Sequence, residues 1–512
     1  MSESEVEFAS LAANTTRVGD HLLALGATAD IPDASVQQLL TTAARLYARK
    51  TDEEGRSFTP LADGQVLTAT DVAVTVMALM QAADLNLFDL AMWAGRHSRS
   101  EKAEMVMSDD FKRTYPEIDD WTDSRELLAH ARKQADERKL DDVFIVDIDS
   151  HISDGGNWPE IMDYVEDPVV REAASAFGDG TKRGAFLNST NGLQWQNVWG
   201  RIPHGQGLKE PVDAGELSRE TILARRCIDQ MGLDYQVMFP NAMLFLGMHP
   251  VREMEIHLAT AYNRWLVERV LPEDPRIKAM MYLPFNNPVE AEETVKRFLG
   301  KPGVAGFLVT SSRHKPVHAN EYMRLYGMLE EAGQVLGFHT HLNWQDEYTS
   351  QLNRFISMHA ISFVLCNLVH LTNWVINGLP ERFPKLKVMW IESGVAWLPF
   401  IMQRLDHEYM MRTSEAPLLK KLPSEYMRDM FYTTQPLERT NETLLAASMD
   451  AMNAESQMLF ASDWPHWDFD LPATIWDLQF LDEQAKRNIL GYNAAQLFDL
   501  EIPEKYRALA AE

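Results

Sequence analysis

Three short clusters of side chains that commonly bind metal ions follow apolar segments at wide separations in the chain. They are Asp149-Ser-His151 after Val143–Ile148, His339-Thr-His341 after Val335–Phe338, and Asp463-Trp-Pro-His466 after Met458–Phe460. In an eight-stranded α/β barrel, buried parallel strands end on one face, where active sites are built. Carboxylate and imidazole groups gathered on that face would form a divalent-metal site. The pattern therefore predicts a metalloenzyme.

Spacing within and between the clusters strengthens this prediction. Asp149 and His151 are two residues apart on a predicted strand, so both side chains point the same way. This pair alone is a common and weak pattern, but His339, Glu392 and Asp463 each close another predicted strand. Chance explains four such strand ends poorly. Capping of helices or binding of backbone groups stays open as the alternative, above all for His341 and His466.

Short β-branched segments alternate with longer helical patterns from Asp142 onward, which is typical of a parallel α/β fold. We predict helices that include His257–Val270, Val289–Leu299 and Asn320–Glu331. The predicted strands are Val143–Asp149, Tyr235–Pro240, Ile277–Pro284, Val304–Thr310, Val335–His341, Leu386–Glu392, Met430–Thr434 and Gln457–Asp463. Eight strand-helix units favour a closed (β/α)8 barrel of the TIM type over an open sheet.

The first 140 residues have a different pattern, with helical periodicity at Val36–Lys50, Thr68–Trp93 and Ser124–Lys139. We expect the third of these helices to be charged and exposed on most sides. We predict that residues 1–140 form a helical extension that packs on the barrel or on a partner subunit, and that residues 141–512 form the barrel. The first crossover is too long for one helix and predicts an insertion at about 152–233, with Gly178–Gly207 as a candidate lid.

Composition excludes several classes of function. A net charge of −27 disfavours nonspecific binding to nucleic acid or to anionic membranes, because both attract Lys and Arg. Only Cys227 and Cys366 occur, which favours buried, reduced thiols over a disulfide framework. The acidic N-terminus has no signal-peptide pattern, and the longest apolar candidate that we identify, Val72–Phe88, falls short of the ~18 residues of a membrane span. We therefore expect a cytoplasmic protein.

The region from about residue 142 to 500 resembles the amidohydrolase-related family, the branch of the amidohydrolase superfamily that includes aminocarboxymuconate-semialdehyde and resorcylate-type decarboxylases. The matching segments are Asp147-Ile-Asp-Ser-His151-Ile, Ala261-Tyr-Asn-Arg-Trp265, Gly378-Leu-Pro-Glu-Arg-Phe-Pro384, Glu392-Ser-Gly394 with Arg404-Leu-Asp406, and Ala461-Ser-Asp-Trp-Pro-His466. The resemblance implies metal ligands at Asp149, His151, His339 and Asp463.

The chain departs from the family pattern at two positions. Asp149 replaces a histidine found in many members of the superfamily, and Glu392 stands where several decarboxylases have a catalytic histidine. Val304–Arg313 contains no lysine, so the carbamylated lysine that bridges two metals in related hydrolases is not available. A single metal is the simpler prediction, unless Glu392 bridges two.

The donor set determines the metals and the catalytic groups that we expect. We add Glu392 as a fifth candidate ligand. A set of imidazoles and carboxylates suits Zn²⁺, which is the metal we expect first, and it also suits Mn²⁺ or Fe²⁺. A water bound there would have its pKa lowered toward neutrality. Asp463, Glu392, His341 and His466 are the candidate catalytic residues. Arg201, His204, Arg313 and His314 are candidate contacts for a substrate anion, although ordinary surface positions explain them more simply.

These residues predict a metal-dependent enzyme that hydrolyses a C–N or related bond, or that decarboxylates a small carboxylate without an oxidant. The fold also resembles a two-component aminoisobutyrate hydroxylase, which makes an oxygen-activating Fe/Mn subunit the alternative. A third hypothesis is a metal-containing partner subunit without catalysis. We expect a small-molecule substrate and a homo-oligomer, or a hetero-oligomer with a homologous subunit.

Overall fold

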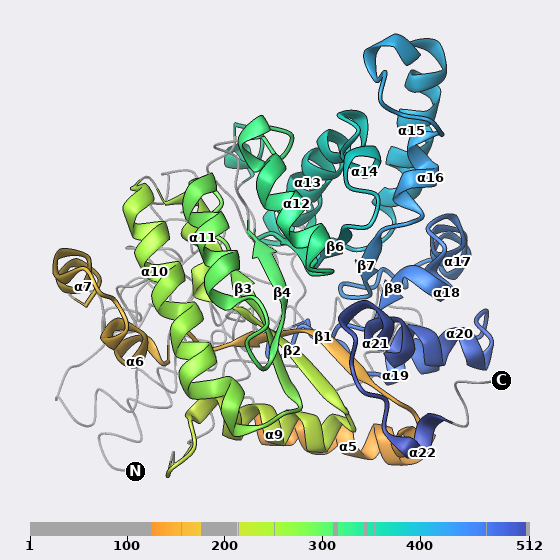
Figure 1. Cartoon of the computed structure of the whole chain (residues 1–512). Coiled ribbons are helices and arrows are strands. Elements are labelled where there is room, and N and C mark those ends of the chain that lie inside the picture. Colours follow the sequence, from red (N-terminus) through yellow and green to blue (C-terminus); the bar gives the residue numbers. More distant parts are fainter. Residues whose placement is uncertain are drawn as a thin grey trace, which may run out of the picture. The chain divides into compact units, whose positions relative to one another are not determined.

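In a computed structural model, eight parallel strands form the centre of the barrel region (Figure 1). The structure describes residues 124–154, 156–175, 212, 215–249, 251–310, 316–341, 347–352, 355–466 and 468–507. The strands are β1 (Val146–Ile152), β2 (Tyr235–Pro240), β3 (Ile277–Tyr282), β4 (Val304–Val309), β5 (Val335–His339), β6 (Lys387–Ile391), β7 (Phe431–Thr433) and β8 (Met458–Leu459). Each strand pairs with the next in sequence order.

The sheet closes into a barrel between β1 and β8. The amide of Ile148 donates to the carbonyl of Phe460 at 3.0 Å, and a parallel bridge joins Ser150 to Trp464. Because β8 has only two residues in regular strand geometry, this contact is made mainly by the segment that follows it. The predicted (β/α)8 barrel is therefore confirmed.

All eight predicted strands are present, but the first is displaced along the sequence. It begins at Val146 instead of Val143, because the preceding residue, Ile145, bonds to Asp234 through its amide and its carbonyl instead of joining the ladder. The strand then continues to Ile152. Asp149 and His151 consequently lie within β1 and not at or beyond its end.

Helices surround the strands on the outside (Figure 1). Those that follow β2 to β8 are α10 (Arg252–Trp265), α11 (Pro288–Phe298), α12 (Met323–Glu331), α13 (Phe355–Ile376), α14 (Leu379–Arg382), α15 (Trp397–Met411), α16 (Pro423–Met427), α17 (Glu442–Ala451), α18 (Ala454–Gln457), α19 (Ala473–Trp476), α20 (Glu483–Arg487), α21 (Asn493–Phe498) and α22 (Glu504–Arg507). Asn287 caps α11 by accepting the amide of Glu290, and Pro288 occupies the first turn, where it costs no hydrogen bond. The three predicted crossover helices thus correspond to α10, α11 and α12, with shifted ends.

Helix α5 (Ser124–Arg138) confirms the third helix predicted in the N-terminal region, but the expectation that it is exposed on most sides was wrong. Leu127, Leu128 and Ala131 are buried, and α5 packs against α9 (Arg219–Met231). Helical spacing places these apolar residues on one face, and that face is buried although the residues between them are charged. Arg138 pairs with Asp477 at 2.7 Å.

Part of the predicted insertion after β1 lies within the described residues. It contains α6 (Trp158–Asp163) and α7 (Pro168–Ser175) before α9 returns to β2. The candidate lid, Gly178–Gly207, lies outside the described residues, as do the predicted helices Val36–Lys50 and Thr68–Trp93. The division of the chain at residue 140 stays a prediction.

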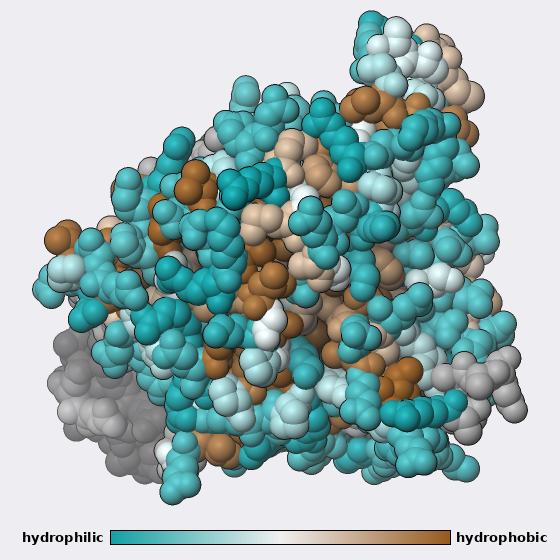
Figure 2. Space-filling view, in the orientation of Figure 1, coloured by the Kyte–Doolittle hydropathy of each residue, from teal (hydrophilic) through white to brown (hydrophobic). Residues whose placement is uncertain are grey.

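Helix α13 corrects the expectation about apolar length. Its segment Ile356–Ile376 is long and apolar enough to cross a membrane, by length and composition only. Polar residues interrupt this segment, but none of them is charged, so it stays apolar on average. Ser362 and Asn367 on its buried side bond to strand ends of the barrel, which is typical of a helix in the outer layer of a globular fold. Polar and charged residues cover most of the face shown in Figure 2.

The interior of the barrel below the strand ends is packed with side chains. Gly337 lies two residues before His339 on β5. A Cβ at Gly337 would lie 3.0 Å from Ile391 and 3.1 Å from Met280, so the glycine makes room for these two larger side chains. The barrel therefore has a solid apolar floor beneath the groups at its carboxyl-terminal end, as expected for this architecture.

Candidate metal centre

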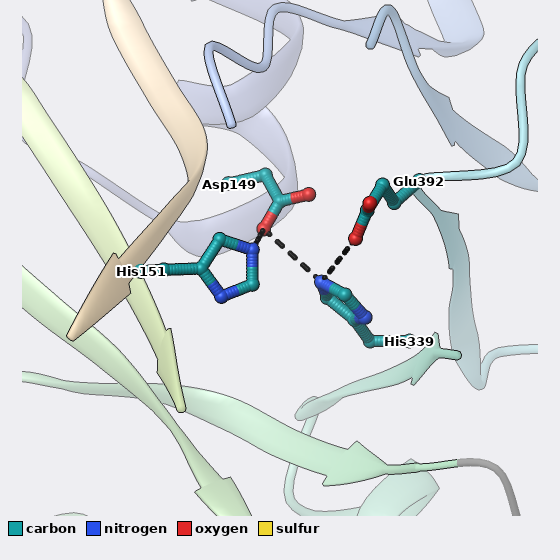
Figure 3. A group of neighbouring side chains, drawn as sticks. All are labelled: Asp149, His151, His339 and Glu392. Atoms are coloured by element: carbon teal, nitrogen blue, oxygen red, sulfur yellow. Dashed lines mark ion pairs between the residues drawn. The ribbon is translucent and has the colours of Figure 1, made fainter. Parts of the chain in front are cut away.

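Four ligand-type side chains from three strands meet at the carboxyl-terminal end of the barrel (Figure 3). Asp149 and His151 come from β1, His339 ends β5, and Glu392 follows β6 directly. One nitrogen or oxygen from each lies within 4.8 Å of those of the others, and all four residues are buried. His339 Nε2 is 3.4 Å from Asp149 Oδ1 and 3.2 Å from Glu392 Oε2.

A second group overlaps the first and contains His151, Asp463 and His466. Asp463 Oδ1 lies 2.9 Å from His151 Nε2 and 2.7 Å from His466 Nδ1. Because His151 belongs to both groups, the structure brings all five predicted ligands into one buried cluster. We call this cluster of candidate ligands the metal centre; it consists of Asp149, His151, His339, Glu392 and Asp463.

The two imidazoles of the metal centre are oriented by backbone carbonyls. His151 Nδ1 lies 2.8 Å from the carbonyl oxygen of Pro240, and His339 Nδ1 lies 2.7 Å from that of Thr340. A carbonyl only accepts hydrogen bonds, so each Nδ1 carries a proton and donates it. When such a ring is neutral, its lone pair is on Nε2, which faces the carboxylates. Metal-binding histidines are held in this way.

Several buried atoms of the metal centre have no hydrogen-bond partner among the described residues. They are both carboxylate oxygens of Asp149 and of Glu392, Oδ2 of Asp463, and Nε2 of His151 and of His339. A buried carboxylate oxygen without a partner is costly, and here five such oxygens from three carboxylates lie together. A divalent cation would bind these same atoms and offset their charge, so the residues present fit a divalent metal.

Proton affinities in the cluster reflect this crowding of like charges. Burial favours the neutral imidazole of His151, but its contact with Asp463 and the charge of Asp149 raise the pKa of His151 to about 9. Burial and the charges of Asp463 and Asp149 raise the pKa of Glu392 well above its usual range. Burial and the neighbouring imidazoles of His151 and His339 lower the pKa of His466 well below the usual value. Without a cation, protons must supply the positive charge.

Two ligands of the metal centre have an uncommon backbone conformation. Glu392 has φ 52° and Asp463 has φ 60°, in the left-handed region that non-glycine residues rarely adopt. Such a residue costs roughly 1–2 kcal/mol, which surrounding contacts must offset. The amide of Glu392 donates to Thr433 Oγ1 at 3.0 Å, and the amide of Asp463 donates to the carbonyl of Asp149 at 2.8 Å. These bonds hold both carboxylates in position.

The other predicted site residues differ in location. His466 contacts Asp463 as described. His341 is buried but belongs to neither ligand group, and the centre of its ring lies 4.1 Å from the centre of the Phe245 ring. The candidate anion contacts Arg201, His204, Arg313 and His314 lie outside the described residues.

Sequence reasoning missed two buried polar residues that support the metal centre. Asp147 on β1 accepts hydrogen bonds from residues next to the ligands, and burial raises its pKa to about 6. Asn367 on α13 donates to the carbonyls of Phe338 and Ile391, each the neighbour of a ligand. The alternation of Asp147, Asp149 and His151 was a usable signal for the first. Asn367 has no local sequence signal, because its role depends on how α13 docks.

Comparison with known proteins agrees with this fold and cluster. A model of the amidohydrolase family matches residues 146–500, and the chain belongs to that family. The gamma-resorcylate decarboxylase of Polaromonas sp. (strain JS666) is 24% identical over 286 residues, which cover 54% of this chain and 86% of the relative. The corresponding enzyme of Rhizobium sp. (strain MTP-10005) is 23% identical over 289 residues, with the same coverage of both chains.

A solved structure supports the fold. The 5-carboxyvanillate decarboxylase of Novosphingobium aromaticivorans, in complex with manganese and 4-hydroxy-3-methoxy-5-nitrobenzoic acid, superposes with a TM-score of 0.50 at 19% identity. The match covers 70% of this chain and 96% of that chain. The family resemblance drawn from the motifs is confirmed by the family model.

Proposed function

We propose that this protein is a metal-dependent decarboxylase that releases CO2 from a small hydroxylated aromatic acid without an oxidant. The observation that carries the proposal is the buried metal centre, in which five carboxylate oxygens and the Nε2 atoms of both imidazoles have no hydrogen-bond partner among the described residues. The names of the related enzymes, resorcylate and carboxyvanillate decarboxylases, support this substrate class.

The reaction requires that a proton reach the ring carbon while the carboxylate leaves as CO2, so that the electron pair of the broken C–C bond ends in a C–H bond. When bound, the cation supplies positive charge that binds and orients the substrate carboxylate. Asp463 is the residue best placed to carry the proton, because His466 Nδ1 lies 2.7 Å from its Oδ1. Glu392 lies across the cluster next to His339 and can hold a second proton. Burial of all these groups excludes bulk water from the exchange.

We propose Mn²⁺ as the resident metal, in place of the zinc expected from the sequence. Three carboxylates and two imidazoles make a hard donor set, which suits Mn²⁺ well. The manganese in the related carboxyvanillate decarboxylase supports the same choice. Metal analysis of protein purified without added metal tests it; one equivalent of zinc and none of manganese would contradict it.

The same donor set favours a second candidate, an oxygen-activating hydroxylase subunit. Two imidazoles with carboxylates also suit Fe²⁺, alone or beside Mn²⁺. Oxygen uptake that depends on substrate would support this candidate, whereas CO2 release under argon supports decarboxylation. Hydrolysis of a C–N bond would yield an amine or ammonia and neither of these signals. A partner subunit without catalysis would show no turnover with any substrate.

The decisive experiment measures CO2 released from 2,6-dihydroxybenzoate and 5-carboxyvanillate by the manganese-loaded protein under argon. We expect turnover of at least one such acid and a loss of two or more orders of magnitude in the Asp463→Asn variant. Asp429→Asn removes a charge that pairs with Lys421 on the surface and should keep full activity. Hydrolysis without CO2 release by the wild-type protein would overturn the proposal.

We further propose a cytoplasmic oligomer that binds neither membranes nor nucleic acid, in which the partner is a second copy or a homologous subunit. The net charge of −27 supports the absence of binding to membranes and nucleic acid, because negative charge repels their phosphate groups. Large apolar side chains are exposed on α13 and α15, including Ile356 (77%) and Met411 (65%), and a partner subunit would cover such residues. Light scattering on the eluting protein measures the mass; a monomer at micromolar concentration would contradict the oligomer.

A further inference from the structure

The strand that carries Asp149 and His151 contains an irregularity next to them. The pairing of β1 with β2 shifts register between Asp147 and Ser150. A bulge of this kind leaves backbone groups outside the ladder and turns the next side chain to a new direction. Bulges are frequent next to active sites for this reason. Here the irregular segment includes Asp149, one of the candidate metal ligands.

The carboxylate of Asp147 occupies this irregularity and gathers four donors. Its Oδ1 accepts the amide of Asp149 at 3.2 Å and the amide of Ser462 at 2.8 Å. Its Oδ2 accepts the hydroxyl of Ser150 at 2.5 Å and that of Ser462 at 2.6 Å. Asp147 has no exposed surface, so no water competes for these bonds.

The four bonds connect the residues that flank two metal ligands. Asp149 follows Asp147 by two positions, and Ser462 directly precedes Asp463. Since β8 has only two regular residues, the segment that carries Asp463 joins β1 through a few backbone contacts, among them the bond from the amide of His151 to the carbonyl of Trp464 at 2.7 Å. The carboxylate of Asp147 accepts the amide of Ser462 in the place of a strand carbonyl. It thereby fixes the segment of Asp463 against that of Asp149.

Only a carboxylate suits this position. Each carboxylate oxygen accepts two hydrogen bonds, so Asp147 satisfies all four donors at once. An asparagine would keep one accepting oxygen, but its NH2 group would face two hydroxyls that must then turn away. An alanine would leave two backbone amides buried without partners.

We propose that Asp147 is the positioning residue of the metal centre: it sets the spacing of Asp149 and Asp463 and thereby the affinity for the divalent cation. This inference rests on the proposed function only in requiring that the metal centre binds a cation. Asp147 does not touch the cation; it acts through Ser462 and through the backbone of Asp149. Residues that orient ligands in this way commonly change metal affinity by 10–100-fold.

The test compares Mn²⁺ affinity and stability in three variants of the full chain. We expect Asp147→Asn and Ser462→Ala to weaken Mn²⁺ binding at least tenfold in calorimetric titrations, and Asp147→Ala to weaken it further. The matched control is Asp234→Asn, which removes a carboxylate that accepts the amide of Ile145 just before the same strand. This control should lower the melting temperature of the metal-free protein and leave Mn²⁺ affinity within twofold of the wild type.

The readouts separate positioning from a merely structural role. If Asp147→Asn and Ser462→Ala lower the melting temperature but bind Mn²⁺ as tightly as the wild type, the inference is overturned. Should Asp147→Ala fail to fold, Ser462→Ala decides, because it keeps the carboxylate and removes only a hydroxyl, which donates to Asp147 and accepts the amide of Trp464 at 3.0 Å. A wild-type protein that binds no divalent cation would refute the proposed function itself. Tight binding by the wild type with unchanged binding in the variants would refute this inference alone.

Discussion

The backbone amide of Asp463 donates a hydrogen bond to the backbone carbonyl of Asp149 at 2.8 Å. More than 300 positions separate these two carboxylate ligands in the sequence, and the bond joins β1 to the segment after β8. The contact that closes the barrel therefore also sets the metal centre. We therefore expect binding of a cation and closure of the barrel to be coupled, since both depend on the same two residues being in place.

Removal of the metal should destabilise the whole barrel for this reason. Without a cation, the carboxylates of Asp149, Glu392 and Asp463 repel one another in a buried space. Binding at a concentration 1,000-fold above Kd stabilises a native state by about 4 kcal/mol. We expect the melting temperature to fall on chelation by several °C and to recover with Mn²⁺. Scanning calorimetry with a chelator measures this, and identical melting curves with and without metal would contradict the coupling.

Glu392→Gln should act in opposite directions on two properties. Loss of one carboxylate removes repulsion with Asp463 and Asp149, so the metal-free protein should melt at a higher temperature, by a few °C. The same change removes a charged ligand beside His339, so Mn²⁺ affinity should fall tenfold or more. The left-handed backbone at this position is unchanged by the substitution. A variant that is less stable without metal would show that Glu392 has a structural role instead.

The sequence predicted the positions of the strands well and their roles at the metal centre in part. Apolar β-branched runs mark buried parallel strands clearly, and His339 and Glu392 lie at the strand ends where the pattern placed them. The bulge in β1 was not predictable, because it depends on pairing with β2 and on the carboxylate of Asp147. The displaced start of β1 was not predictable either, because it depends on a hydrogen bond from the amide of Ile145 to Asp234, which is distant in the sequence.

Asn367→Ala should loosen the half of the metal centre that β5 and β6 provide. The Asn367 amide donates to the carbonyls of Phe338 and Ile391 and to Ser393 Oγ at 2.7–3.3 Å. Each buried acceptor left without a donor costs about 1–3 kcal/mol. We expect unfolding at lower denaturant concentration and a several-fold weaker affinity for Mn²⁺. The control Asn377→Ala removes an amide that bonds only within α13 and its end, and should leave Mn²⁺ affinity unchanged.

The stability of the protein should fall between about pH 4.5 and pH 8 because of Glu255 on α10. Burial raises the pKa of this carboxyl from 4.5 to about 8, against the opposing effect of the polar groups of Asn286 and Phe285. A raised pKa means that the folded state binds the proton more tightly than the unfolded state. The stabilisation is therefore complete below the unfolded pKa and is lost as the pH rises through the folded pKa.

Glu255→Gln isolates this contribution, because glutamine does not ionise. The free energy of unfolding of the variant, relative to the wild type, should increase from pH 5 to pH 8 by roughly 3–5 kcal/mol, since each pKa unit corresponds to about 1.4 kcal/mol. Denaturant titrations at both pH values, with a chelator present so that metal binding does not contribute, measure the difference. Glu253→Gln on the exposed side of the same helix is the control and should show no such dependence on pH. An equal difference between variant and wild type at both pH values would mean that Glu255 is ionised throughout this range.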